Sequence, residues 1–178
     1  MKHVTYCLLA LAFVAVAVRA EESPAPLLKN GSFADMKNDR PTNWVITPAD
    51  QAVAVDKDQR PVEGTQSLRV DIKKVAESQG SISQLLRNVP PNTKLALTAK
   101  VKGTAARLGY VQVKLKKGGK ETKRQKSEWN NADWQELKVE IATEDADELT
   151  VECRFSQSEK AKDQSVWFAD VALVEVKG

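Results

Sequence analysis

Histidine and cysteine are nearly absent from the sequence, which has one histidine, His3, and two cysteines, Cys7 and Cys153. Two of these three residues lie in a segment with the pattern of a secretory signal. It has a basic start at residues 2–3, an apolar run over 7–18, and small or tolerated residues before a cleavage site after Ala20. The apolar run is shorter than the roughly 20 residues that a membrane span needs, so we expect no membrane span.

The expected mature chain, residues 21–178, has no histidine and a single cysteine. This excludes Ser-His-Asp and Cys-His catalysis, histidine-ligated zinc or copper, thiolate metal clusters and an intramolecular disulfide. Carboxylate chemistry, an oxygen-ligated metal such as calcium, and binding without chemistry remain. Cys153 alternates with Leu149, Val151 and Phe155, so we predict that its thiol is buried.

Excess charge of one sign is also scarce. Loss of Lys2 and Arg19 with the signal leaves 25 basic and 24 acidic residues, so the formal net charge falls from +3 to +1. This balance gives no reason to expect nucleic acid as a partner. The acids at 144–148 read as an exposed turn, and no acid stands in an apolar setting suited to acid–base catalysis. We therefore predict that the protein is not an enzyme.

Alternation of apolar and polar residues, the pattern of a half-buried strand, recurs along the chain. Turn signals such as those at 90–92 and 118–119 separate the strands, and helical periodicity is weak, with at most one turn at 73–79. Residues 21–27 read as a flexible lead. The rest, 28–178, is predicted to be one all-β domain, an antiparallel β-sandwich. The predicted strands cover 67–72, 94–102, 110–115, 134–141, 149–155 and 166–176.

Short motifs occur in order between residues 28 and 176. They are LKNGSF at 28–33, PTNW at 41–44, GTQSLRV at 64–70, QL at 84–85 with VPPN at 89–92, DWQEL at 133–137 and WFADVAL at 167–173. In this order and spacing they resemble the carbohydrate-binding modules of families 4, 9 and 22. The resemblance implies a galactose-binding-like jelly roll and a non-catalytic protein that recognises poly- or oligosaccharide.

In the resembling modules the sugar lies on the concave face of one sheet. Sugar C–H faces stack on aromatic rings, and Tyr110 on a polar strand face and Trp129 in a polar loop are the expected platforms. Amide and guanidinium groups give forked hydrogen bonds to sugar hydroxyls. An ordinary solvated face, with Trp129 folded back as a lid, is the alternative. Trp44, Trp134 and Trp167 are expected in the core. The expected polar ligand-binding residues are Gln84, Thr98, Lys100, Gln112 and Arg154.

The segment 114–126 holds seven lysines or arginines and one acid, Glu121. One interpretation is a solvated hairpin tip. The other is a site for an anionic, for example sulfated, polysaccharide, with Trp129 adding stacking to charge. Strong salt dependence would separate this binding from recognition of a neutral sugar. The polyanion-binding residues would be Lys116, Lys117, Lys123 and Lys126.

Modules of the resembling kind often hold a structural calcium, which oxygen ligands suit. Asp170 matches the closing aspartate of the family, and Gly64 and Ser67 lie where loop ligands would come from. Ala34 stands where the family has an acid, and Asp35 is one place late. Calcium is therefore a candidate cofactor, and no other cofactor is expected.

A second class of function stays open, that of a structural or protein-interaction module at a cell surface. Its polar sheet face would be inert toward sugars, and its partners would be other secreted proteins. In both cases we expect a secreted protein, whether periplasmic, cell-surface or extracellular.

Overall fold

The computed structural model describes residues 26–176, so the predicted signal and its cleavage point lie outside the described residues. Within this range the chain is almost entirely strand and loop, apart from one short 3₁₀ helix, η1. In chain order the elements are β1 (Met36–Lys37), β2 (Arg40–Pro41), β3 (Val45–Thr47), β4 (Val53–Asp56), β5 (Ser67–Asp71), β6 (Gly80–Arg87), β7 (Lys94–Gly103), β8 (Gly109–Lys117), β9 (Lys120–Lys126), β10 (Gln135–Ala142), β11 (Glu148–Phe155), η1 (Glu159–Ala161) and β12 (Ser165–Glu175).

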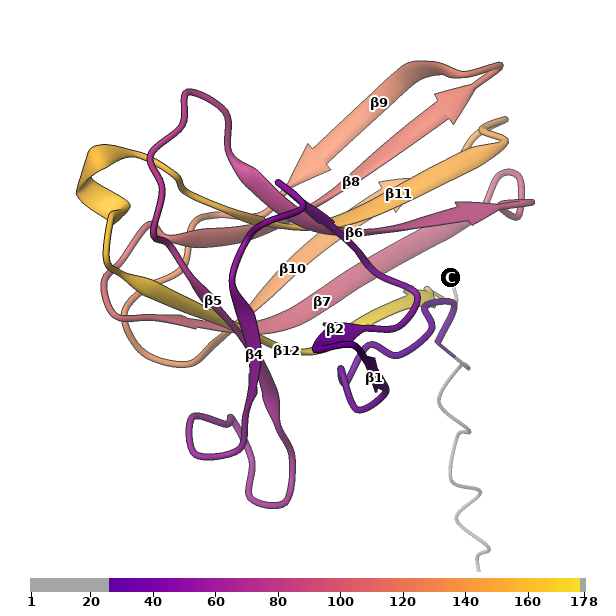
Figure 1. Ribbon diagram of the computed structural model, residues 1–178. Helices are drawn as coiled ribbons and strands as arrows, with labels where there is room; N and C mark the ends of the chain where they lie inside the picture. Colours follow the sequence, from indigo (N-terminus) through magenta and orange to yellow (C-terminus); the bar gives the residue numbers. More distant parts are fainter. Residues whose placement is uncertain (1–25, 177–178) are drawn as a thin grey trace, which may run out of the picture.

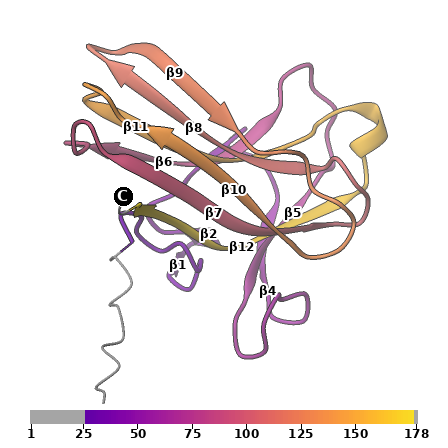
Figure 2. The same ribbon diagram turned by 180° about the vertical axis from the view of Figure 1, so that it is seen from behind.

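Ten of these strands form two five-stranded antiparallel sheets. Sheet I has the order β3-β6-β11-β8-β9, and sheet II has the order β10-β7-β12-β5-β4, while β1 pairs only with β2. The two sheets face each other as two layers (Figures 1 and 2). This arrangement confirms the predicted antiparallel β-sandwich.

The core lies between the two sheets because period-two alternation turns one side of each strand inward. On β8 and β11, Val111, Val113, Val151 and Cys153 all have no exposed surface. Each fully buried aliphatic or aromatic side chain favours folding by roughly 1.5–3 kcal/mol. The predicted burial of Cys153 is confirmed, and this burial raises the pKa of its thiol well above the ordinary value.

The predicted strands agree with the observed ones to within about two residues at each end. The segment 73–79, for which the sequence allowed at most one helical turn, is irregular. Strand β9 was not predicted as a strand, because its sequence KETKRQK has no apolar residue to alternate. It is an edge strand, where charge is common because it discourages pairing with other chains.

The motifs at 28–33 and 41–44 attach the N-terminal segment to the rest of the sandwich. The indole N–H of Trp44 donates to the carbonyl of Asn30 at 2.9 Å, and its ring packs at 5.3 Å from that of Phe33. The Val171 amide donates to the Gly31 carbonyl at 3.0 Å. A Cβ on Gly31 would lie 1.9 Å from the Val171 carbonyl oxygen, so only glycine allows this approach. These motif residues therefore have a structural role.

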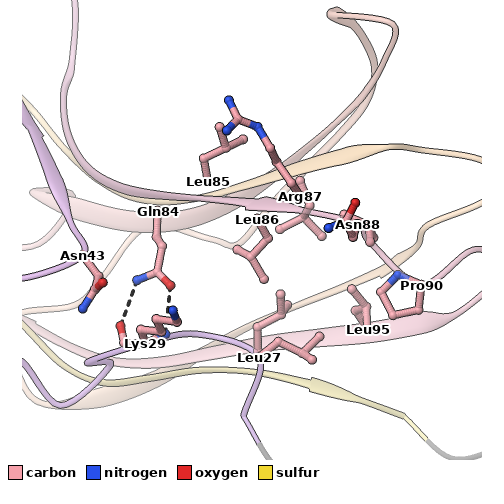
Figure 3. Close-up of a pocket in the computed structure, with 13 residues that line it drawn as sticks. Leu27, Lys29, Asn43, Gln84, Leu85, Leu86, Arg87, Asn88, Pro90 and Leu95 are labelled. Carbon is pink, nitrogen blue, oxygen red and sulfur yellow. Dashed lines mark hydrogen bonds between the residues drawn. The ribbon is translucent and has the colours of Figure 1, made fainter.

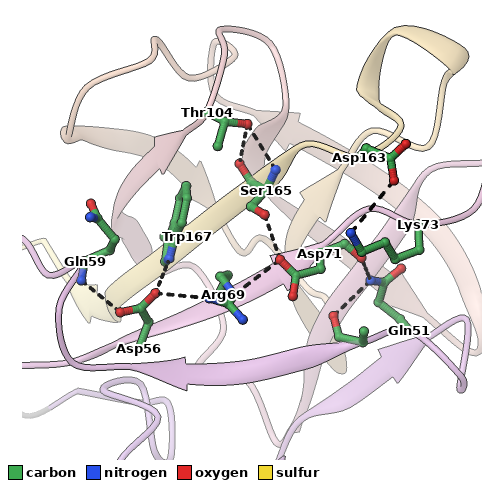
Figure 4. Close-up of polar contacts among 11 residues, drawn as sticks. Gln51, Asp56, Gln59, Arg69, Asp71, Lys73, Thr104, Asp163, Ser165 and Trp167 are labelled. Atoms are coloured by element: carbon green, nitrogen blue, oxygen red, sulfur yellow. Dashed lines mark hydrogen bonds and ion pairs between the residues drawn. The ribbon is translucent and has the colours of Figure 1, made fainter.

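A polar network covers the outer face of sheet II (Figure 4). One carboxylate oxygen of Asp56 accepts from the backbone amides of Asp58 and Gln59, and the other accepts from the indole N–H of Trp167 at 2.9 Å. Arg69 lies 3.7 Å from the same carboxylate. Burial alone would raise the pKa of Asp56, but the bonds from Gln59 and Trp167 outweigh it and leave the pKa lowered.

The three tryptophans expected in the core have different environments. Trp44 is buried between the sheets, which confirms the expectation. Trp167 is also buried, at 7% exposure, but on the outer side of sheet II beneath Asp56 and Gln59. Trp134 is only half-buried and lies beside Lys100 and Pro61, so for this residue the expectation is wrong.

We expect Gly31→Ala to lower the free energy of unfolding by roughly 1–3 kcal/mol, because the new methyl group must displace the β12 backbone. Chemical denaturation of this variant beside Ser32→Ala, at an exposed neighbouring position, measures the effect. Equal stability of the two variants would contradict the close approach.

We expect Asp56→Asn to cost about 1–3 kcal/mol at neutral pH, because an amide cannot accept from both backbone N–H groups and the Trp167 indole. The lowered pKa of Asp56 stabilises the fold above its unfolded pKa of about 3.9, and this stabilisation is lost as pH falls through the folded pKa. The stability difference between wild type and variant should therefore shrink below about pH 4. Denaturation curves between pH 2 and 7 measure it, and a pH-independent difference would contradict it.

Candidate functional site

The outer face of sheet I is built by the register of β8 against β11. In that register Tyr110 lies opposite Arg154, Gln112 opposite Glu152, and Lys114 opposite Thr150. All of these side chains point away from the core, because their neighbours Val111, Val113 and Val151 point into it. The pairing therefore brings three sequence-predicted residues, Tyr110, Gln112 and Arg154, onto one surface.

An aromatic pair stands at one end of this face. The rings of Tyr110 and Trp129 meet edge to face, with centroids 4.6 Å apart and an interplanar angle of 65°. The Tyr110 hydroxyl donates to the Gln79 side-chain oxygen at 2.6 Å. Tyr110 is only 8% exposed, whereas Trp129 is half-buried. Trp129 is thus the accessible ring, and Tyr110 supports it rather than offering an open face of its own.

Glu152 lies at the centre of the face and was not singled out from the sequence. Its carboxylate accepts from the Gln112 amide and from Lys114 Nζ at 2.9 Å, and Arg154 Nη1 lies 3.6 Å away. Arg154 also donates to the Gln79 carbonyl at 3.1 Å. Glu152 is 93% buried, so its carboxylate holds the neighbouring side chains in place. Its position opposite Gln112 is the signal that could have revealed it.

Three residues predicted for the same face lie elsewhere. Gln84 points between the sheets, where its amide pairs with both the backbone N–H and the carbonyl of Lys29 at 2.8 Å. Thr98 and Lys100 lie on β7, which belongs to sheet II. For Thr98 and Lys100, the alternation correctly predicted that the side chains face away from the core. It could not predict to which of the two sheets their strand belongs. These three residues do not join Tyr110, so that part of the prediction is wrong.

The basic segment 114–126 forms β8, β9 and their turn, and much of its charge is paired. Lys117 lies 2.8 Å from Asp145, and Lys123 lies 2.7 Å from Glu144. Arg124 pairs with Glu121. The acidic turn at 144–148 therefore offsets part of the positive charge of the hairpin. Of the predicted polyanion-binding residues, only Lys116 and Lys126 have no ion pair within residues 26–176.

A pocket of about 370 Å³, here called the end pocket, lies where β8 begins and β11 ends. Trp129 forms part of its wall. The adjacent Asn130 is buried, and its side-chain oxygen accepts from the amides of Leu108 and Gly109 at 2.8 and 2.7 Å. Asn130 thereby fixes both the loop before β8 and the position of Trp129. The end-pocket lining comprises Gln79, Ala105, Ala106, Arg107, Leu108, Trp129, Ser156, Ser158, Lys160 and Ala161.

A larger pocket, of about 490 Å³, lies at the opposite end of the sandwich, where β11 begins (Figure 3). The side chains of Leu27, Leu86, Leu95 and Leu149 make much of its wall, and the Gln84–Lys29 pair lies at one side. Polar side chains such as Asn43, Arg87 and Asn88 also line it, but no aromatic ring does. Because a sugar ring stacks on an aromatic side chain, the aromatic and polar surface of sheet I is the stronger candidate site.

The residues expected to bind calcium do not form a suitable set of donors. Asp170 and Gly64 do line one hollow, but Ser67 is buried and donates to the Gln59 carbonyl at 2.5 Å. The Asp170 carboxylate lies 3.5 Å from the Lys100 ammonium, which would repel a second cation. No group of three or more Asp, Glu, His or Cys side chains that could hold a metal occurs in residues 26–176.

Comparison with known families and structures assigns the chain to a family. The profile of the carbohydrate binding domain family (CBM_4_9) matches residues 25–160, so the chain belongs to this family and carries a carbohydrate-binding domain. Among curated proteins no sequence matches. Within the described residues, no helix has the length and apolarity to cross a membrane.

Solved structures share the fold at low sequence identity. A CBM22-1 xylan-binding domain from Paenibacillus barcinonensis Xyn10C has a TM-score of 0.64 at 20% identity, with 89% of this chain and 99% of that chain covered. A CBM4 structure has a TM-score of 0.59 at 16% identity, with 83% of this chain and 99% of that chain covered. TmCBM61 in complex with β-1,4-galactotriose has a TM-score of 0.58 at 14% identity, with 85% of this chain and 99% of that chain covered. These neighbours confirm the jelly-roll fold.

Larger proteins contain the same fold as one part. The chain spans 21% of the enzymatically active domain of a bacteriophage CBA120 tailspike protein and 27% of the α-L-arabinofuranosidase MgGH51. At 13% and 15% identity, these neighbours add only the fold.

We expect thermal unfolding to be the same with millimolar calcium and with a chelator, because Lys100 already neutralises the one carboxylate of the hollow. A binder that prefers the folded state would raise the melting temperature by mass action. Differential scanning calorimetry measures it, and a calcium-dependent rise of several degrees would contradict the expectation.

Proposed function

We propose that the protein is a secreted, non-catalytic module that binds poly- or oligosaccharide on the outer face of sheet I. The observation that carries this proposal is the Trp129 ring, held against Tyr110 at the edge of the Gln112–Glu152–Arg154 cluster. The family assignment supports the ligand class. Two neighbours point the same way, one titled as a xylan-binding domain and one as a complex with a galactotriose.

Recognition would combine stacking with hydrogen bonds. The half-buried Trp129 ring receives the apolar face of a sugar, and the edge contact with Tyr110 keeps it from rotating. Arg154 and Lys114, with side chains 20% and 19% exposed, donate to sugar hydroxyls, while Glu152 beneath them sets their direction. Each such bond contributes about 0.5–1.5 kcal/mol, so several are needed for useful affinity.

The opposite edge of the face is apolar. Val45 on β3 is 65% exposed and pairs with Ser83, and Leu85, two residues further along β6, is 45% exposed. Both side chains point to the same side as Glu152, which lies opposite Ser83 on β11. A glycan that crosses the strands from Trp129 would meet polar groups first and this apolar edge last.

The charges on this face argue against glycoside hydrolysis. Two carboxyl groups about 5–9.5 Å apart are needed for that reaction. The Glu152 carboxylate is held by Lys114 and Arg154, and the next outward acid on its strand is Glu148. Four residues of strand place the Cα atoms of these two acids about 13 Å apart. This spacing supports binding without chemistry.

The polyanion alternative at the hairpin tip has less support, because Lys117 and Lys123 are paired with Asp145 and Glu144. Exposed pairs of this kind contribute little to stability, but they cancel the local positive field. The outer face of sheet I remains the surface with both aromatic and hydrogen-bonding groups.

We expect Trp129→Ala to weaken binding to the best ligand of a neutral glycan array at least tenfold, because the stacking platform is lost. Arg154→Gln should weaken it several-fold. Trp134→Ala and Lys100→Gln are the matched controls. Lys100 lies on sheet II and Trp134 lies beside it, just before β10, so both variants should leave affinity unchanged. Isothermal titration on variants with unchanged melting temperatures gives the measurement.

If Trp129→Ala and Trp134→Ala weakened glycan affinity equally, the site would not be on the outer face of sheet I. Silence of the folded protein across a broad array would reject the carbohydrate proposal and favour a protein-interaction module.

A further inference from the structure

The end pocket has an unusual balance of charge. Arg107 and Lys160 are the charged residues of its lining, and no carboxylate contributes to it. Both cations are exposed, and neither takes part in any ion pair formed by residues 26–176. Other basic residues are paired with acids, as Lys117 and Lys123 of the hairpin are. The pocket is thus a local excess of positive charge on a nearly neutral chain.

The remaining polar side chains that line the pocket are uncharged. The hydroxyls of Ser156 and Ser158 lie 3.1 Å apart. Gln79 uses its side-chain oxygen to accept from Tyr110, so its amide N–H₂ is the donor available toward the pocket. Trp129 supplies the aromatic wall. Stacking surface, paired hydroxyls, one amide and two cations together match a sugar ring that carries a negative group.

The pocket is held in shape by backbone contacts rather than by the charged side chains. The amide of Arg107 donates to the Asn130 carbonyl at 2.8 Å, and Arg107 itself has a φ of 64°, in the left-handed region. A non-glycine residue adopts this conformation only where its surroundings fix it. The Ser156 amide likewise donates to the Leu108 carbonyl at 2.8 Å. Neutral substitutions of the two cations should therefore leave the pocket intact.

The pocket is continuous with the outer face of sheet I. Trp129 belongs to the pocket wall and also packs on Tyr110, and Gln79 lines the pocket while it contacts both Tyr110 and Arg154. A glycan lying on the sheet would therefore place its end at this pocket. A volume of about 370 Å³ falls within the ordinary range for small-ligand sites, about 300–1,000 Å³.

We propose that the end pocket binds an anionic sugar unit, a uronic acid whose carboxylate meets Arg107 and Lys160 while its ring stacks on Trp129. The proposal rests on the proposed function and adds a substrate class to it, an acidic glycan bound through a terminal or near-terminal acid. The guanidinium forms a forked pair with a carboxylate, and the ammonium adds a point charge. A neutral sugar gains neither interaction, so the pocket selects for charge.

The test is an NMR titration of the ¹⁵N-labelled protein with D-galacturonate and D-glucuronate, beside D-galactose and D-glucose as neutral counterparts. The readout is the indole N–H signal of Trp129, assigned from its absence in Trp129→Phe. We expect saturable shifts with the uronates at low salt, weaker shifts at high salt, and at least tenfold weaker binding of the neutral sugars. A sulfated galactose in the same series distinguishes a carboxylate site from a general anion site.

The variants separate charge from shape. Arg107→Gln/Lys160→Gln should weaken uronate binding at least tenfold at an unchanged melting temperature. Lys162→Gln, an exposed lysine outside the pocket lining two residues from Lys160, removes one positive charge and should change affinity less than twofold. Uronate affinity that survives the double substitution, or equal affinity for uronate and neutral sugar, would overturn the proposal.

The two proposals fail in different ways. Neutral glycan binding that Arg154→Gln weakens, together with no uronate response at Trp129, would reject the anionic pocket and keep the binding face on sheet I. A uronate response that Arg107→Gln/Lys160→Gln removes, on a protein silent toward all glycan chains, would keep the pocket and reject the polysaccharide function.

Discussion

The antiparallel register of β8 against β11 is the constraint on which both the core and the candidate site depend. One side of this pairing places Val111 and Val113 against Cys153 and Val151 in the core. The other side sets Gln112 against Glu152. A slip of one residue would send the polar set inward and the valines outward, at a cost of several buried apolar side chains. The core thus fixes the register, and the register fixes the binding face.

Several of the motifs that reveal the family stabilise loops. Asn30 and Gly31 join the N-terminal segment to Trp44 and Val171, and Trp167 is bonded to Asp56. Such contacts need particular side chains at particular backbone positions, which is why they are visible as sequence motifs. The residues that line the end pocket, and Tyr110, Gln112, Glu152 and Arg154 on the outer face of sheet I, lie outside these motifs. A family resemblance therefore identified the fold more securely than the site.

The same contrast explains what sequence reasoning could and could not predict. Alternation located β7, β8, β10 and β11 because each buries one side. It could not locate β9, whose residues are all polar, nor show that Lys100 belongs to sheet II, because alternation assigns a side and not a sheet. Gln84 points inward against its polar character because the Lys29 backbone needs both a donor and an acceptor there. Contacts between distant segments of this kind leave no local pattern.

Charge placement shows the same dependence on contacts between distant segments. By sequence, the strongest positive field should lie at the hairpin tip, but the turn at 144–148 brings Glu144 and Asp145 against it. The tip and the end pocket lie at opposite ends of β8, so the acids at the tip leave Arg107 and Lys160 at the other end as a separate positive site. A hollow lined by cations concentrates their field more than an exposed tip does. An anionic ligand would therefore be drawn to the end where Trp129 stands, which joins charge and stacking at one place.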